Sequence, residues 1–145
     1  MTNYKAKTNG ILNDKKAKIF GNRIEQLIKK CGGSVKPLDI IQDARSPKSP
    51  LHSFFDWNDD SAAEKWRLHQ ARMMLSQVME TVLVQGKQNE FRSFHNVRIT
   101  DKETAYVTLK KVIDTPNYTQ QLIDDAENYL RLLMYTLKVL RRRIK

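Results

Sequence analysis

Apolar residues recur at helical spacing in three stretches of the N-terminal half and predict three helices. Residues 15–30, 37–44 and 62–84 each place apolar side chains on one face, with a period of three to four residues. The glycine pair 32–33 can adopt positive φ and end the first helix, and Pro37 suits the first turn of the second. The third stretch has a wide apolar face, which is typical of a central helix contacted from more than one side.

A loop rich in large aromatic side chains, residues 46–61, separates the second and third predicted helices. Burial of each of Phe54, Phe55 and Trp57 contributes about 1.5–3 kcal/mol. We therefore expect the loop to fold back onto the core and to join the first half of the chain to the long helix. The Ser-Ala-Ala-Glu sequence of residues 61–64 matches a capping box for that helix.

The C-terminal half predicts a β-hairpin and a long last helix. Residues 94–100 and 104–109 are rich in β-branched and aromatic side chains, as in paired strands, and such a hairpin must lie on the helices to be stable. Thr115 and Pro116 suit the N-cap and first position of the helix. Its apolar residues repeat at alternating spacings of four and three. This seam consists of Ala126, Leu130, Leu133, Leu137, Leu140 and Ile144. We expect it to pack against residues 62–84 of the same chain, and a dimer seam is the alternative.

These elements predict a mainly α-helical fold with one β-hairpin and a long C-terminal helix. The order helix, helix, helix, hairpin partly matches a winged helix, and the first two helices resemble a helix-turn-helix. We expect residues 1–13 to form a flexible basic arm and residues 14–145 to form a single helical domain. Within it, 14–58 would hold the helix-turn-helix-like half with the aromatic loop, and 59–145 the long helix, the hairpin and the last helix.

The charge distribution points to a polyanionic partner. The net charge is +10, and residues 1–30 hold eight Lys and Arg against only Asp14 and Glu25. A second basic excess lies in residues 121–145, where it also matches the negative end of the last helix dipole. Such fields attract nucleic acid, and duplex DNA is the partner we expect. The expected DNA-binding residues are Lys15, Lys16, Lys18, Lys36, Arg45, Lys48, Arg98, Lys102, Lys110 and Lys111.

Sequence signatures of common enzymes are absent. The chain has no Gly-rich phosphate loop, no Cys-x-x-Cys and no His-Glu-x-x-His. The histidines lie in separate segments, and His52 is expected to hydrogen-bond to backbone within the loop rather than to act in catalysis. Cys31 is expected to be a half-buried, unreactive thiol. We therefore expect no enzymatic activity, no cofactor and no metal site.

The sequence also bears on the compartment. The first residues lack the apolar run of a signal peptide, and a single cysteine cannot form an internal disulfide. No apolar run approaches the roughly 20 residues of a membrane span. These features predict a cytoplasmic protein that does not associate with membranes.

One part of the chain, roughly residues 33–78, resembles a group of uncharacterised proteins from tailed phages and prophages. The shared positions are Ser49-Pro50-Leu51-His52, Phe55, Trp57, Ala62-Ala63, Arg67 and Gln70-Ala71-Arg72. The resemblance implies a phage-derived gene and, with the basic charge, a role in handling DNA during replication, recombination or regulation.

The sequence as a whole favours a non-enzymatic protein that binds duplex DNA through phosphate contacts. Two alternatives stay open. One is a protein-interaction module, such as a homodimer through the 126–144 seam, that recruits a phage replication or recombination enzyme. The other is an enzyme that uses the aromatic loop as a pocket.

Overall fold

The computed structural model describes residues 2–58 and 63–144. The chain forms two compact units, residues 1–109 and 110–145. The first unit combines helices with two small antiparallel sheets, and the second is helical. The described chain is therefore a mixed α/β protein with a large helical share. The expected division into an arm, 1–13, and one helical domain, 14–145, differs from these two units.

The first two helices are those that the apolar spacing predicts. Helix α1 spans Asp14–Lys30 and α2 spans Pro37–Ala44. The side chain of Asn13 caps α1 by accepting a hydrogen bond from the backbone N–H of Lys16, at 2.8 Å. Both glycines of the 32–33 pair have positive φ, +83° and +109°, which confirms their role in ending α1.

The third helix is shorter than expected, because its second half is a strand. Helix α3 spans Ala63–Gln77, and β2 follows at once as Val78–Val84. The prediction of one helix over 62–84 was therefore wrong after Gln77. Strand β2 is rich in valine, and its residues 79–84 pair with β3, Lys87–Arg92. The turn between them, 85–86, has positive φ at both residues, as in a type I′ hairpin. The expected capping box at 61–64 falls partly outside the described residues.

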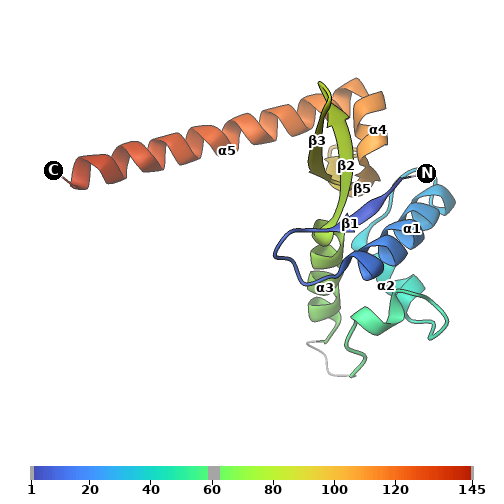
Figure 1. Cartoon of the computed structure of the whole chain (residues 1–145). Coiled ribbons are helices and arrows are strands. Elements are labelled where there is room, and N and C mark those ends of the chain that lie inside the picture. Colours follow the sequence, from blue (N-terminus) through green and yellow to red (C-terminus); the bar gives the residue numbers. More distant parts are fainter. Residues whose placement is uncertain (1, 59–62, 145) are drawn as a thin grey trace. The chain divides into compact units, whose positions relative to one another are not determined.

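The N-terminal segment is a strand of the folded unit, not a flexible arm. Strand β1, Tyr4–Ala6, pairs antiparallel with β2, which places Tyr4 opposite Glu80 and completes a sheet of order β1-β2-β3. Tyr4 is buried, and α1 packs against β1 and β2 (Figure 1). Burial of this aromatic ring explains why the segment is held despite its polar sequence.

The predicted hairpin at the C-terminal end of the first unit is confirmed. Strands β4, Phe94–Arg98, and β5, Thr104–Thr108, form a separate two-stranded sheet. Val35, between α1 and α2, joins this hairpin through a pair of backbone hydrogen bonds with Tyr106, at 2.7 and 2.9 Å. In place of the single hairpin expected after the third helix, the described chain therefore has two.

The aromatic loop packs onto the core, as expected. It contains a short 3₁₀ helix, η1, His52–Phe54. Phe55 is buried, and Phe54 and Trp57 pack against the same core from the edge. The core lies between α1, α2, α3 and the first sheet. Its fully buried apolar side chains include Ala17, Ile24, Ile40, Ile41, Ala44, Leu51, Ala71, Met74, Leu75 and Val78.

The second unit is built from two consecutive helices. Helix α4 spans Leu109–Asp114 and was not expected, whereas α5, Pro116–Arg143, begins at the predicted residues. The two are linked by a hydrogen bond of 2.7 Å from the Thr119 hydroxyl to the Val112 carbonyl. At 1.5 Å per residue, α5 is about 42 Å long.

Candidate functional site

Three lysines in the first turn and a half of α1 form an exposed group of neighbours among the expected DNA-binding residues. Lys15, Lys16 and Lys18 are exposed, and none has an ion-pair partner among the described residues. Asn13 fixes the start of the helix, and the Asp14 carboxylate accepts a hydrogen bond from the Ala6 N–H, at 2.9 Å. The sheet and the helix start are thus joined, so the lysines project from a defined position. We call them the α1 lysines.

The α1 lysines lie at the unfavourable end of their helix. A helix N-terminus carries partial positive charge, and each cation there opposes folding by about 0.3–1 kcal/mol. Helix stability therefore does not account for them. The arginines 141–143 differ, because they occupy the last turn of α5, where the dipole favours cations.

Other expected DNA-binding residues are already paired with carboxylates. The Lys36 ammonium is 3.2 Å from Glu103, and the Arg45 guanidinium is 3.1 Å from Glu64. Lys110 pairs with Asp114 four residues along, at 2.6 Å. Such surface pairs add little stability, but each partner carboxylate offsets the local positive charge.

The remaining expected residues lie on separate elements. Lys48 is exposed in the turn after α2, Arg98 ends β4, and Lys102 lies at the tip of the β4–β5 hairpin. Lys111 lies in α4 of the second unit. Lys110 and Lys111 are also neighbours on one helix, but Lys110 is ion-paired with Asp114. Among the expected residues, only the α1 lysines form a group of three on one helix.

The shared motif of the aromatic loop has a structural explanation centred on Arg67, a role that the sequence reasoning did not assign. Arg67 is only 4% exposed, and it donates to the backbone carbonyls of Asp56, at 2.9 Å, and Asn58, at 3.2 Å. Its guanidinium lies 5.0 Å from the centre of the Trp57 ring, a cation–π distance. Glu64 and Arg67, three residues apart on α3, also form an ion pair at 3.3 Å. This spacing of Glu64 and Arg67 is the sequence signal from which their ion pair could have been predicted.

His52 supports the same loop. Its Nδ1 is 2.7 Å from the Ala44 carbonyl oxygen, and because a carbonyl only accepts, Nδ1 carries the proton. His52 therefore bonds to backbone, as expected, but the acceptor is the last residue of α2 and not the loop itself. The ring stacks on Trp57 at 5.1 Å, and the Trp57 indole N–H donates to the His52 carbonyl, at 2.9 Å. His52 is thus occupied in holding the loop.

A second polar network ties the loop to α1. Asp43 accepts hydrogen bonds from the Arg23 guanidinium and, at 2.7 Å, from the Ser49 hydroxyl. Burial disfavours the ionised carboxyl of Asp43, but these bonds outweigh that effect and hold its pKa below its ordinary value. Ser49 also accepts from the Leu51 N–H, at 3.2 Å, so it too has a structural role in the motif.

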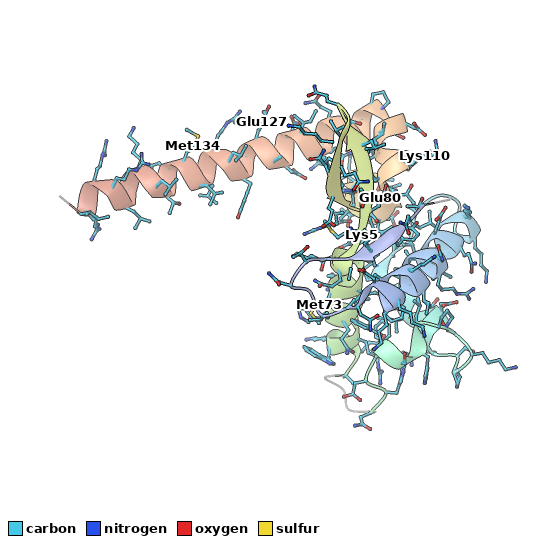
Figure 2. The ribbon with its side chains drawn as sticks, in the orientation of Figure 1. Lys5, Met73, Glu80, Lys110, Glu127 and Met134 are labelled. Atoms are coloured by element: carbon cyan, nitrogen blue, oxygen red, sulfur yellow. The ribbon has the colours of Figure 1, made fainter. Side chains whose placement is uncertain are left out.

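Helix α5 exposes an unusual amount of apolar surface. The predicted seam is exposed, with Leu130 at 57%, Leu137 at 52% and Leu140 at 54%. An open hollow of about 640 Å³ runs along this helix between Met134, Leu137 and Arg141. Because one helix alone lines it, it is a surface groove and not an enclosed substrate pocket. Figure 2 shows the side chains of Glu127 and Met134 extending outward from α5.

Other kinds of site receive no support from the described residues. Within 2–58 and 63–144 there is no His, Cys, Asp and Glu cluster suited to a metal ion, and no helix long and apolar enough to cross a membrane. Cys31 is exposed, not half-buried as expected. Comparisons with protein-family models, with curated proteins and with solved structures found no match to this chain.

Proposed function

We propose that the chain is a non-enzymatic DNA-binding protein that contacts duplex phosphates through the α1 lysines. The observation that carries this proposal is the position of Lys15, Lys16 and Lys18 at the positive end of α1, exposed and without ion pairs among the described residues. Three ammonium groups and the helix dipole add to one positive field, and phosphate is the anion that such a field attracts.

Contacts of this kind bind DNA without reading its sequence. Lysine is a point charge on a flexible stem, so it meets phosphate oxygens without fixed geometry. Lys48 and Lys102 would add contacts of the same type. Sequence preference would have to come from base contacts by α2 or by the β4–β5 hairpin, as in a winged helix.

The biological setting of the proposal rests on the resemblance of residues 33–78 to tailed-phage and prophage proteins. A phage-derived, basic, cytoplasmic protein of this size fits DNA replication, recombination or regulation. The loop motif carries that resemblance, and its described members Ser49, His52, Trp57 and Arg67 hold the fold together. The motif therefore supports common ancestry rather than a shared catalytic site.

The experiment that tests the proposal compares three variants with the wild-type chain on fluorescent duplex and single-stranded DNA, from about 50 to 200 mM salt. The first replaces Lys15, Lys16 and Lys18 with glutamine, the second replaces them with arginine, and the third replaces the ion-paired Lys36, Arg45 and Lys110 with glutamine. The last removes the same charge from residues that already have acidic neighbours.

The glutamine variant of the α1 lysines should bind duplex DNA more weakly, with a salt slope lower by about 2.7, or about 0.9 per lost phosphate contact. The arginine variant should retain binding, and the third variant should lose less. Removal of three cations from a helix N-terminus should also stabilise the fold by about 1 kcal/mol, so misfolding could not explain weaker binding. No duplex binding at 50 mM salt, or equal binding by the first variant and wild type, would contradict the proposal.

A second candidate function is that of a protein-interaction module, because α5 exposes apolar side chains along the seam. Such a module would use α5 to hold a second copy of the chain or a phage replication or recombination protein. The two functions are compatible, since they use different units of the chain.

A further inference from the structure

Helix α5 carries too much exposed apolar surface for a helix that functions alone in water. Its exposed large apolar side chains are Ile123, Tyr129, Leu130, Leu132, Leu133, Met134, Tyr135, Leu137, Val139 and Leu140. Continuous apolar patches of this kind mark interaction surfaces. A surface helix of a monomer would instead show polar residues over most of its circumference.

The seam has the spacing of a helix pair. Leu130 and Leu137 occupy one set of core positions, Leu133 and Leu140 occupy the other, and the steps between them alternate between three and four residues. In the heptad notation abcdefg these are the a and d positions. Ala126 and Ile144 extend the pattern at its ends. The partner surface that fits such a seam is a second helix with the same repeat.

Charge selects the direction of that second helix. The start of α5 is acidic, with Asp124, Asp125 and Glu127, whereas its end carries the basic run 141–143. A parallel pair of copies would set the two basic runs side by side. An antiparallel pair would set each basic run against the acidic start of the other copy, so that opposite charges meet at both ends.

We propose that two copies of this chain pair through α5 in an antiparallel coiled coil. Each a position then faces a d position of the other helix, so Leu130 lies opposite Leu140 of the second copy, and Leu133 opposite its Leu137. The two-fold axis passes near residue 135. This register also brings Glu127 across the seam from Arg141 of the second copy, at both ends of the pair.

The groove along α5 borders the seam at Leu137, and its other lining residues, which include Met134, Tyr135 and Arg141, lie off the seam. Glu127 is also 3.7 Å from Arg131 of its own helix, and both side chains are more than half exposed, so Glu127 remains accessible to a second cation. The inference rests on the interaction surface assigned above to α5, and not on DNA binding.

The first test is the mass of the full chain in solution by light scattering. We expect twice the 17.0 kDa of one chain. Replacing Leu133 and Leu137 together with glutamine should give the mass of one chain. The matched control replaces Leu132 and Tyr135 with glutamine in the same way. These residues are exposed on α5 but lie off the seam, so this variant should keep the mass of two chains. A wild-type mass of one chain would overturn the proposal.

Disulfide cross-linking tests the direction and the register, in a background in which Cys31→Ser removes the native thiol. Met134→Cys should form a dimer under mild oxidation, because residue 134 meets its own copy across the two-fold axis. Leu130→Cys should not, since residues 130 of the two copies would be separated by about 15 Å along the pair, at 1.5 Å per residue. The reverse result would show a parallel pair and overturn the proposal.

The two proposals fail in different ways. Cross-linked Met134→Cys protein that does not bind DNA would contradict the DNA-binding function alone. A chain with the mass of one copy that still binds duplex DNA through the α1 lysines would contradict the antiparallel pair alone. The chain could instead co-purify with a larger folded protein and require that protein to stay soluble. Such a result would show that the seam binds that protein, and it would also overturn the antiparallel pair.

Discussion

The ring of Tyr4 lies directly on Gly21, in the middle of α1, and leaves no space for a Cβ atom there. The Tyr4 hydroxyl reaches past the glycine to donate to the Glu25 carboxylate, at 2.7 Å. Tyr4 also stacks on Phe94 of β4, with ring centres 5.7 Å apart. One side chain of β1 therefore contacts α1 and the start of β4, and the glycine is what permits its close approach.

Gly21→Ala should destabilise the protein, although alanine is the better helix former. Alanine would gain about 1 kcal/mol in helix propensity. Its Cβ, however, would overlap Cγ and both Cδ atoms at the base of the Tyr4 ring, which cannot move without the backbone of β1. Overpacking of this kind costs about 1–3 kcal/mol. We expect a net loss of about 1 kcal/mol, measured by urea unfolding.

Removal of the ring should reverse the sign of that effect. In a Tyr4→Ala background the space above residue 21 is open, so Gly21→Ala should there stabilise the protein by its propensity alone. If Gly21→Ala changed the free energy of unfolding equally in the wild-type and Tyr4→Ala backgrounds, this double-mutant cycle would show that β1 does not pack on α1. The N-terminal segment would then be the flexible arm that the sequence suggested.

Gln85→Asn should stabilise the β2–β3 hairpin. Gln85 and Gly86 both have positive φ, +50° and +76°, and a type I′ turn prefers asparagine before glycine. Asparagine tolerates the left-handed region better than glutamine does. We expect a gain of about 0.5 kcal/mol in the free energy of unfolding. Gln85→Val, a β-branched control, should lose stability, and a neutral result for both would contradict the turn geometry.

The same hairpin shows where sequence reasoning reached its limit. Val78 and Val82 continue the three-to-four spacing of α3, so a helix through Val84 fits the pattern as well as a strand does. The choice is made by pairing with β1 and β3, which are distant or polar segments with no strong strand pattern of their own. By contrast, α1, α2 and α5 have local start or stop signals such as the 32–33 glycines and Pro116, and their bounds could be predicted.

The candidate site was predictable only in part. Clustering of Lys15, Lys16 and Lys18 follows from sequence, because neighbours on a helix stay together. The pairing of Lys36 with Glu103 does not, because it depends on how the β4–β5 hairpin meets the chain before α2. The burial of Arg67 was hidden for a related reason. Its partners are backbone carbonyls of the loop, which have no sequence signature.

Arg67→Lys should cost about 2–3 kcal/mol of stability. The Arg67 guanidinium donates to two loop carbonyls, pairs with Glu64 and lies over the Trp57 ring. A lysine ammonium lacks the planar arrangement of donors that makes these contacts possible together. Arg72→Lys, on the exposed face of the same helix, is the matched control and should stay within about 0.5 kcal/mol of wild type. Equal stabilities of the two variants would show that the Arg67 fork contributes little.

His95, on β4, gives the fold a pH dependence. Burial lowers the pKa of its imidazole, and the charge of Arg92 acts in the same direction. Its Nε2 donates to the Arg92 carbonyl oxygen, at 2.7 Å, which partly opposes the shift. The neutral ring is therefore the form that the folded protein accepts more readily.

Stability should consequently fall as the pH is lowered through and below the ordinary histidine pKa of about 6.5. In that window the unfolded chain takes up a proton on residue 95 while the folded chain does not, so protons favour unfolding. His95→Gln retains a donor for the Arg92 carbonyl but cannot titrate. The free energy of unfolding of both proteins can be measured by urea titration between pH 8 and pH 5.5. As the pH falls, His95→Gln should lose less stability than wild type. His69→Gln, which removes an exposed imidazole from α3, is the matched control. If the stability of His95→Gln fell with decreasing pH as steeply as that of wild type, His95 would not be the cause of the pH dependence.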